Sequence, residues 1–182
     1  MKNFSTKDMV FTALFAAIFC ILAPFSIPIG EVPVSVTNFL IYITIYAIGW
    51  KKATVSYIIY LLLGFVGLPV FAGFTGGISK LVSPTGGYLV GFIFTSVISG
   101  LIIEKFNYKR IPNIIGMIVG LAITYIFGTA WLAFGMGRTF MEALAIGVLP
   151  FLIFDFGKII IVAIIGPELQ KLIKKLLNLV LI

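Results

Sequence analysis

Long apolar runs separated by short charged segments dominate the hydrophobic pattern of this chain. A helix that crosses the hydrocarbon of a bilayer needs roughly 17–25 mostly apolar residues, and six runs approach or reach that length. They cover residues 9–24, 34–50, 53–66, 85–103, 114–134 and 144–165. The pattern predicts an all-α integral membrane protein, folded as a six-transmembrane-helix bundle in a single domain over residues 1–182.

The basic residues alternate between the two sides of this layout. Cytoplasmic loops carry an excess of Lys and Arg, and most of these residues fall on the side that holds both chain ends. That side holds Lys2, Lys7, Lys51, Lys52, Lys105, Lys109, Arg110, Lys171, Lys174 and Lys175, whereas the other side holds Lys80 and Arg138. We therefore expect a multi-pass protein of the plasma (cytoplasmic) membrane with cytoplasmic N- and C-termini.

The chain beyond the sixth run predicts a helix on the membrane surface. Gly166 and Pro167 suit a helix end, because glycine fits a C-cap and proline cannot continue the preceding helix. Lys171, Lys174 and Lys175 then recur on one helical face, with leucines and isoleucines largely on the other. This pattern is typical of a C-terminal amphipathic helix that lies on the anionic inner leaflet.

Composition supports the membrane assignment and excludes several classes of function. Of the 182 residues, 61% are hydrophobic and 10% are charged, with a mean hydropathy of +1.21, whereas soluble domains are about 45–50% apolar and about 25% charged. The net charge of +7 sits between apolar runs, so we expect membrane lipid and not nucleic acid as its partner. With no histidine and one cysteine, Cys20, we expect no zinc site, no histidine-based catalytic triad and no cofactor.

A glycine- and proline-rich segment separates the third and fourth runs. Residues 67–84 hold four glycines and two prolines, which makes a continuous helix improbable there. The segment is also too apolar for a freely solvated loop. Irregular backbone at membrane depth is tolerated where protein buries it or where it lines a cavity. The sequence predicts an irregular outer segment that contributes to a ligand site, or alternatively an external loop that caps the bundle.

Two ionisable residues lie within the sixth run. Asp155 and Lys158 are three residues apart, so they share a helical face. Such residues are costly inside a membrane and usually mark a functional site. A carboxylate beside an ammonium offers one acceptor and one donor group to a small polar ligand. A structural ion pair that ties the helix into the bundle, or a group used in proton coupling, would produce the same pattern.

Small residues on the first run suggest a surface for close helix packing. Ala13, Ala16 and Ala17 place small side chains at the spacing that lets helices approach closely in lipid. Gly87 and Gly91 have the same spacing on the fourth run, where packing inside the bundle accounts for it. For the alanines, both internal packing and docking of another subunit fit the pattern.

The glycine-rich segment carries a long motif that resembles the signature of a known family. The sequence reads G-L-P-V-F-A-G-F over residues 67–74, then G-G at 76–77, then P-T-G-G-Y-L over 84–89 followed by Gly91-Phe92. This motif, the charged pair and the six-run layout resemble the BioY family, the biotin-specific substrate-binding (S) components of energy-coupling-factor (ECF) transporters. One departure is Ser83, where the resemblance leads us to expect glycine.

The resemblance implies a biotin pocket near the outer face of a six-helix membrane bundle. Asp155 and Lys158 would bind the polar ureido head of biotin, and Ala13, Ala16 and Ala17 would dock on the transmembrane coupling subunit. Walls, close backbone contacts and further hydrogen bonds would come from Asn38, Phe71, Gly73, Phe74, Gly77, Ser79, Thr85 and Tyr88.

The resemblance also implies partners, because the chain carries no nucleotide-binding motif. ATP-driven uptake would then require a transmembrane coupling subunit and two cytoplasmic ATPase subunits, with this chain capturing biotin and catalysing no reaction. The alternative function is a stand-alone, ion-coupled secondary transporter of a small vitamin-like solute, although we detect no inverted repeat. An intramembrane enzyme would need a second carboxylate, a metal set or an activated nucleophile. A non-transporting assembly subunit would need neither the charged pair nor the irregular segment.

Overall fold

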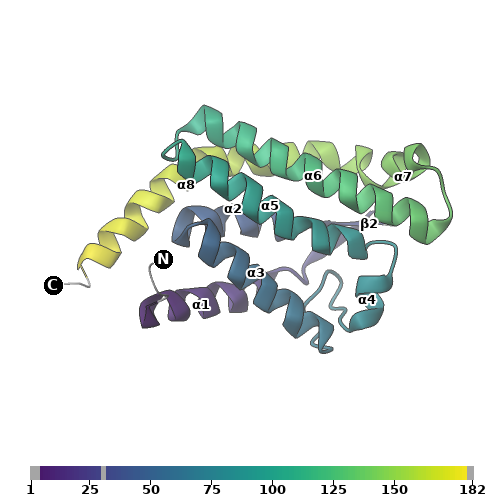
Figure 1. Cartoon of the computed structure of the whole chain (residues 1–182), viewed down its shortest axis with the longest axis horizontal. Helices are drawn as coiled ribbons and strands as arrows, with labels where there is room; N and C mark the ends of the chain where they lie inside the picture. Colours follow the sequence, from purple (N-terminus) through teal and green to yellow (C-terminus); the bar gives the residue numbers. More distant parts are fainter. Residues whose placement is uncertain (1–4, 30–31, 180–182) are drawn as a thin grey trace.

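The computed structural model describes residues 5–29 and 32–179, and the protein is almost entirely helical (Figure 1). The elements, in chain order, are α1 (Thr6–Leu22), β1 (Ser26–Ile29), β2 (Val32–Ser35), α2 (Thr37–Ile48), α3 (Trp50–Phe65), α4 (Ile78–Val82), α5 (Gly86–Lys105), α6 (Arg110–Met136), α7 (Phe140–Gly147), the 3₁₀ turn η1 (Leu149–Phe151) and α8 (Leu152–Leu179).

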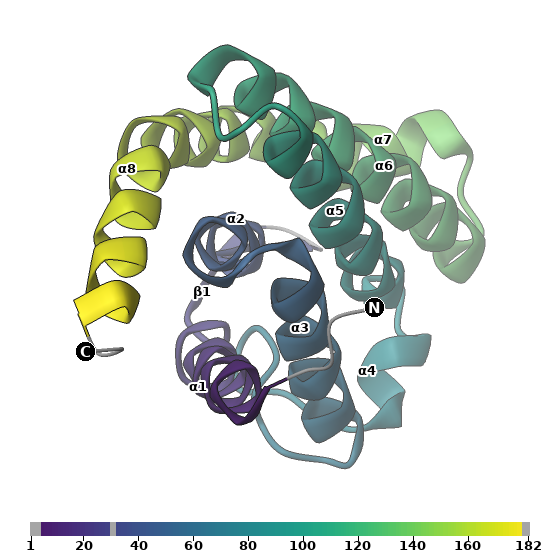
Figure 2. The same cartoon turned by 60° about the vertical axis from the view of Figure 1, so that its left-hand side comes forward.

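Helix α2 occupies the middle of the bundle, where α3 and α8 pack against it (Figure 2). The pairs α5–α6, α1–α3 and α3–α5 also form extensive helix contacts. One residue, Gly49, separates α2 from α3, and its φ of 82° is a conformation that favours glycine. The hairpin, α4 and α7 lie at one end of the bundle, and α1 starts and α8 ends at the other (Figure 1).

Two polar contacts hold together the end of the bundle where α1 starts. Lys52 Nζ lies 2.7 Å from Asp8 Oδ1, which joins α3 to α1. The backbone N–H of Trp50 donates to Glu104 Oε1 at 3.2 Å, which joins the α2–α3 turn to the end of α5. Segments that the charge pattern assigns to one side of the membrane therefore lie together in space.

The apolar helices confirm the membrane character of the chain. Three helical segments in the described part of the chain are long and apolar enough to cross a bilayer: Gly86–Lys105, Arg110–Met136 and Phe140–Lys175. Helices α1 and α3 coincide with the first and third predicted runs to within a few residues, and α2 is a shorter apolar helix. The count of six spans stays a prediction.

A β-hairpin corrects the all-α prediction and the start of the second predicted span. Residues 34–35 belong to β2, and α2 begins only at Thr37. The two strands pair antiparallel, with Ile27 opposite Val34 and Pro28 opposite Pro33. Each strand has only one neighbour, so both are edge strands, the position at which a sheet tolerates proline. Apolar and polar residues alternate here with a period of two, which is a strand pattern that a search for long apolar runs overlooks.

The sixth predicted span, residues 144–165, is not one helix. Helix α7 ends at Gly147, η1 covers Leu149–Phe151, and α8 starts at Leu152. Pro150 explains the break, because proline has no backbone N–H and its ring clashes with the carbonyl four residues earlier in a continuous α-helix. A capping box between Thr139 and Glu142 starts the separate helix α7.

The prediction that a helix ends at Gly166-Pro167 is wrong. Helix α8 continues through Pro167 to Leu179, and its C-terminal part turns away from the direction of its first part (Figures 1 and 2). A proline inside a helix removes one backbone hydrogen bond and bends the axis without necessarily ending the helix. Lys171 and Lys174 are exposed on the turned part, so its placement on the membrane surface stays a prediction.

The irregular segment between α3 and α5 is held by its own backbone hydrogen bonds. Gly67, Gly73 and Gly77 have positive φ, which explains why this path is rich in glycine. The N–H of Gly77 donates to the carbonyl of Gly64 at 2.7 Å, and the N–H of Phe71 donates to the carbonyl of Thr75 at 2.9 Å. The segment contains only one short helix, α4, as the prediction of irregular backbone requires.

Ser83, the departure from the family motif, fits without strain. Its φ of −63° and ψ of 160° are ordinary extended values that any residue adopts. Its hydroxyl donates to the carbonyl of Lys80 at 2.7 Å, which satisfies an acceptor at the end of α4. Its own carbonyl accepts a hydrogen bond from Trp131 Nε1 at 3.1 Å. Serine therefore supports the local turn.

Candidate functional site

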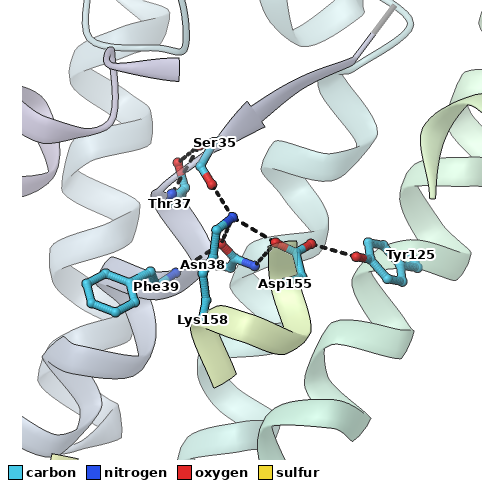
Figure 3. A network of polar contacts seen from close by, with 7 residues as sticks. All are labelled: Ser35, Thr37, Asn38, Phe39, Tyr125, Asp155 and Lys158. Atoms are coloured by element: carbon cyan, nitrogen blue, oxygen red, sulfur yellow. Dashed lines mark hydrogen bonds and ion pairs between the residues drawn. The ribbon is translucent and has the colours of Figure 1, made fainter. Parts of the chain in front are cut away.

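A buried polar network surrounds Asp155, in the first turn of α8 (Figure 3). This residue is only 7% exposed. Oδ1 accepts a hydrogen bond from Asn38 Nδ2 at 2.8 Å and from Lys158 Nζ at 2.7 Å. Oδ2 accepts one from the Tyr125 hydroxyl at 2.6 Å. Three donors from α2, α6 and α8 therefore hold one carboxylate.

Lys158 uses its whole donor capacity inside the same network. Its ammonium donates to the backbone carbonyl of Ser35 at 2.6 Å, to Asp155 Oδ1 at 2.7 Å and to Asn38 Oδ1 at 3.2 Å. A lysine ammonium has three N–H donors, and each has a partner here. The contact with Ser35 fixes the base of the hairpin to α8 (Figure 3).

The network explains how two charged side chains are tolerated in the middle of an apolar bundle. A buried charge is destabilising unless it is paired and its remaining hydrogen-bonding groups are satisfied. Asp155 and Lys158 pair with each other, and Asn38 contacts both of them. The pair is neutral overall, and its hydrogen bonds hold the carboxyl group of Asp155 at a fixed position.

A largely apolar cavity borders this network. Its lining is mainly apolar, with a few polar side chains among the apolar ones, which is the usual composition of a small-molecule site. Its wall is formed by strand β2, by residues of helices α2 to α6 and α8, and by the last residue of α7. Asp155 is the only acidic and Lys80 the only basic side chain among the described residues that line it.

Glycines make room for the two aromatic side chains predicted to line the site. A Cβ at Gly64 would lie 2.1 Å from the ring of Phe71. A Cβ at Gly128 would lie 2.3 Å from the ring of Tyr88, and a Cβ at Gly147 would lie 2.3 Å from its hydroxyl oxygen. That hydroxyl donates to the carbonyl of Gly147 at 3.1 Å. The close approach of backbone at these glycines therefore sets the positions of both rings in the wall.

The structure brings five of the predicted site residues together at the cavity and places a sixth directly behind it. Asn38, Phe71, Thr85, Tyr88 and Asp155 line the cavity. Lys158 does not line it and reaches it only through its hydrogen bonds to Asp155 and Asn38.

Four other predicted contacts lie outside the lining. Gly73 donates its N–H to the carbonyl of Pro24 at 2.9 Å. Phe74 is 59% exposed and packs edge-on against Phe25, with 5.3 Å between the ring centroids. Gly77 precedes α4, and Ser79 is exposed on that helix. Their roles in ligand contact stay predictions.

The three alanines of the predicted docking surface do not share one environment. Ala13 and Ala17 are exposed on α1, whereas Ala16 is 2% exposed and buried in the bundle. Helix α1 packs against α3 with the face that holds its buried residues Thr12, Ala16 and Phe19. The exposed pair is therefore available to a partner, and Ala16 serves internal packing.

Several wall residues escaped the sequence analysis. Tyr125 donates to Asp155 from the middle of α6, and a tyrosine next to Thr124 inside an apolar run was the available signal. Tyr60 also lines the cavity from α3. The carbonyl of Ser35 accepts from Lys158, and a backbone acceptor leaves no trace in the side-chain pattern.

Comparison with known proteins identifies the family. The BioY family matches residues 1–175. The biotin transporter BioY2 of Lactococcus lactis is 36% identical over 171 residues, which are 94% of this chain and 94% of that protein. The biotin transporter BioY of Thermotoga maritima is 37% identical over 166 residues, or 91% and 97% of the two chains.

A solved structure shares the fold. The crystal structure of the S-component for biotin from an ECF-type ABC transporter aligns with a TM-score of 0.84 and 28% identity, covering 94% of this chain and 95% of that one. The resemblance inferred from the glycine-rich motif is thereby confirmed, and the relatives are named as transporters. With the match extending over nearly the whole sequence and the fold shared, this chain is a member of the BioY family.

Proposed function

We propose that this chain captures biotin as the S component of an ATP-driven ECF importer. The observation that carries the proposal is the apolar cavity bordered by the Asp155 network, in a chain whose relatives are named biotin transporters. A mostly apolar pocket with a few fixed polar groups is the usual form of a small-molecule site. The chain itself needs no cofactor in this function, because biotin is bound as the transported substrate.

The ureido head of biotin is placed at Asp155 and Asn38 in this proposal. An ionised carboxylate offers about four acceptor sites, and three hydrogen bonds already reach Asp155. One acceptor site is left for a ureido N–H. The amide of Asn38, which also lines the cavity, is the group best placed to exchange partners and donate to the ureido oxygen.

Lys158 has a supporting role in this arrangement. All three of its N–H donors are used within the protein, so it binds the ligand only if one of those bonds is released. Its ammonium pairs with Asp155 Oδ1 at 2.7 Å, and its bond to the carbonyl of Ser35 holds the hairpin against the cavity. Charged hydrogen bonds are the strong ones in such a network.

The opposite, anionic end of biotin is assigned to Lys80. This side chain is the one basic group among the described lining residues, and it comes from α4 in the irregular segment. A carboxylate near an ammonium in a partly enclosed site gains more than in open water. Phe71, Tyr88 and Phe92 form apolar wall between the two polar regions, which suits the bicyclic ring and its alkyl chain.

Uptake in this proposal depends on partner subunits. The chain spans the plasma membrane six times with both termini in the cytoplasm, and the cavity end faces outward. The exposed Ala13 and Ala17 of α1 form the surface that docks on a transmembrane coupling subunit, since small residues permit close helix approach in lipid. Two cytoplasmic ATPase subunits supply the energy. The stand-alone ion-coupled transporter is not favoured, because the structural relative is a component of an ECF-type ABC transporter.

Equilibrium binding of biotin to the purified, detergent-solubilised chain tests the proposal. Thiamin, riboflavin and lipoate serve as control ligands. We expect saturable one-to-one binding of biotin alone. Binding of a different vitamin would keep a capture function and discard the substrate. No binding by a folded chain would overturn the capture function altogether.

A further inference from the structure

Tyr60 differs from every other buried tyrosine of this protein. The hydroxyls of Tyr42, Tyr57 and Tyr88 donate to backbone carbonyls at 3.0, 2.9 and 3.1 Å. The hydroxyl of Tyr46 accepts from Asn113 Nδ2 at 2.7 Å. The Tyr60 hydroxyl is fully buried and has no hydrogen-bond partner within residues 5–29 and 32–179.

The ring of Tyr60 is fixed by aromatic contacts on three sides. Its centroid lies 5.6 Å from that of Phe19, 5.5 Å from that of Tyr57 and 5.5 Å from that of Phe71. The contact with Phe71 is edge-to-face, with an interplanar angle of 84°. Because these neighbours belong to α1, α3 and the irregular segment, the ring cannot turn its hydroxyl toward solvent without disturbing all three.

The unpaired hydroxyl belongs to a residue that lines the cavity. Tyr60 contributes to the wall from α3, whereas Asp155 contributes from α8. An unpaired polar group inside a protein lowers stability, because it has given up water without gaining a partner. Phenylalanine would fill the same space without that penalty, so the presence of this hydroxyl calls for an explanation.

We infer that the Tyr60 hydroxyl is a ligand-binding and specificity-determining group, which donates a hydrogen bond to an acceptor atom of the bound molecule. The inference rests on the proposed function and deepens it, by adding a polar contact on α3 to the network on α2 and α8. The ligand class it describes is a small molecule with polar groups on one side that meet Asp155 and a further acceptor that faces α3. A site of this kind rejects analogues that lack the acceptor, because the hydroxyl then stays unpaired.

The experiment compares Tyr60→Phe with the matched control Tyr57→Phe on the same helix. Tyr57 is equally buried, its hydroxyl is paired with the Leu89 carbonyl, and it does not line the cavity. Biotin affinity and the Tm of the ligand-free protein are measured for both variants and for the wild type. Affinity reports the contact with the ligand, and Tm reports the contact within the protein.

For Tyr60→Phe we expect biotin affinity to fall about three- to tenfold, the usual effect of one lost hydrogen bond, with a Tm equal to or above that of the wild type. For Tyr57→Phe we expect a lower Tm and wild-type affinity. Wild-type affinity in Tyr60→Phe would overturn the inference and leave the proposed function intact. A lowered Tm in Tyr60→Phe without ligand would also overturn it, because the hydroxyl would then be paired inside the protein, with the Thr37 side chain as its partner. Failure of the wild type to bind biotin would overturn the proposed function and this inference together.

Discussion

Asp155 and Lys158 lie one turn apart on α8, and Nζ of the lysine is 2.7 Å from Oδ1 of the aspartate. Only Asp155 reaches the cavity; Lys158 stands behind it and holds the carbonyl of Ser35 on the hairpin. A charge pair that looks symmetrical in the sequence is therefore divided into one group that meets the ligand and one that holds the first group in place.

The first prediction concerns the charge of Asp155. Asp155→Asn is expected to weaken biotin binding about tenfold or more, because hydrogen bonds to a charged group contribute about 1.5–3 kcal/mol. It should also lower stability, since removing one partner of a buried pair costs about 3–5 kcal/mol. Binding by titration calorimetry and thermal unfolding of the same preparation measure the two effects.

The double variant Asp155→Asn/Lys158→Met separates those effects. It removes both charges, so much of the lost stability should return while biotin affinity stays low. A folded Asp155→Asn protein that binds biotin as the wild type does would exclude Asp155 from the site.

The second prediction concerns Lys80. Lys80→Met is expected to weaken binding of biotin about threefold to tenfold, because a partly exposed ion pair contributes up to about 1 kcal/mol and more when solvent is excluded. Biotin methyl ester has no carboxylate charge, so Lys80→Met and the wild type should bind it with equal affinity. Equal losses for acid and ester would show that Lys80 acts on the shape of the wall and not on the charge of the ligand.

The third prediction concerns the glycine behind Phe71. In Gly64→Ala the new methyl group would lie 2.1 Å from the ring, so the ring must move toward the cavity. Overpacking of this kind costs about 1–3 kcal/mol, and we expect a lower Tm together with weaker biotin binding. Gly157→Ala is the matched control, because nothing lies within 4 Å of its added Cβ. The control should keep wild-type stability or gain about 0.5–1 kcal/mol from helix propensity.

The fourth prediction concerns the exposed alanines of α1. Ala13→Trp should leave biotin binding by the isolated chain unchanged and lower ATP-dependent uptake by the assembled transporter, because the added bulk blocks close approach of a partner helix. Leu14→Trp, at an exposed neighbouring position on the same helix, controls for the size of the indole. Loss of binding in the isolated Ala13→Trp protein would mean that Ala13 packs internally instead.

The fifth prediction is a pH dependence at the end of the bundle remote from the cavity. The hydrogen bond from Lys52, together with those from the Ser5 backbone and hydroxyl, lowers the pKa of Asp8 from 3.8 to about 2. A carboxyl group whose pKa is lower in the folded state stabilises the fold above its unfolded pKa, and that contribution is lost as the pH falls through the folded value.

The wild type should therefore be more stable than Asp8→Asn at pH 7, with a free energy of unfolding higher by an amount on the order of 1 kcal/mol for such a partly exposed pair, and its Tm should be higher accordingly. The difference should shrink between about pH 4 and pH 2. A stability difference between the two proteins that stays constant over this pH range would contradict the prediction. It would mean that the asparagine amide caps α1 less well than the aspartate does, and that the charge of Asp8 is not the cause.

The membrane environment of the chain and the family to which it belongs could both be predicted from the sequence. The preference of a segment for lipid is a sum of the transfer free energies of its single residues. A chain with 61% hydrophobic residues is therefore predicted to be a membrane protein without any knowledge of packing. Asp155 and Lys158 could be paired from their spacing alone, because neighbours on a helical face are set by the helix itself. The glycine-rich motif is a local pattern in the same sense, since its positive φ angles are properties of single residues.

The surroundings of that pair, in contrast, depend on how the helices pack. Asn38 lies 117 positions from Asp155, and Tyr125 lies 30 positions from it, so their hydrogen bonds depend on how α2, α6 and α8 pack. The carbonyl of Ser35 and the unpaired hydroxyl of Tyr60 leave no mark in a hydrophobic pattern, because every residue has a carbonyl and most buried tyrosines have a partner. Transfer free energy is a sum over single residues, whereas a binding site is a set of distances between residues that are remote in the chain. The fold alone fixes those distances.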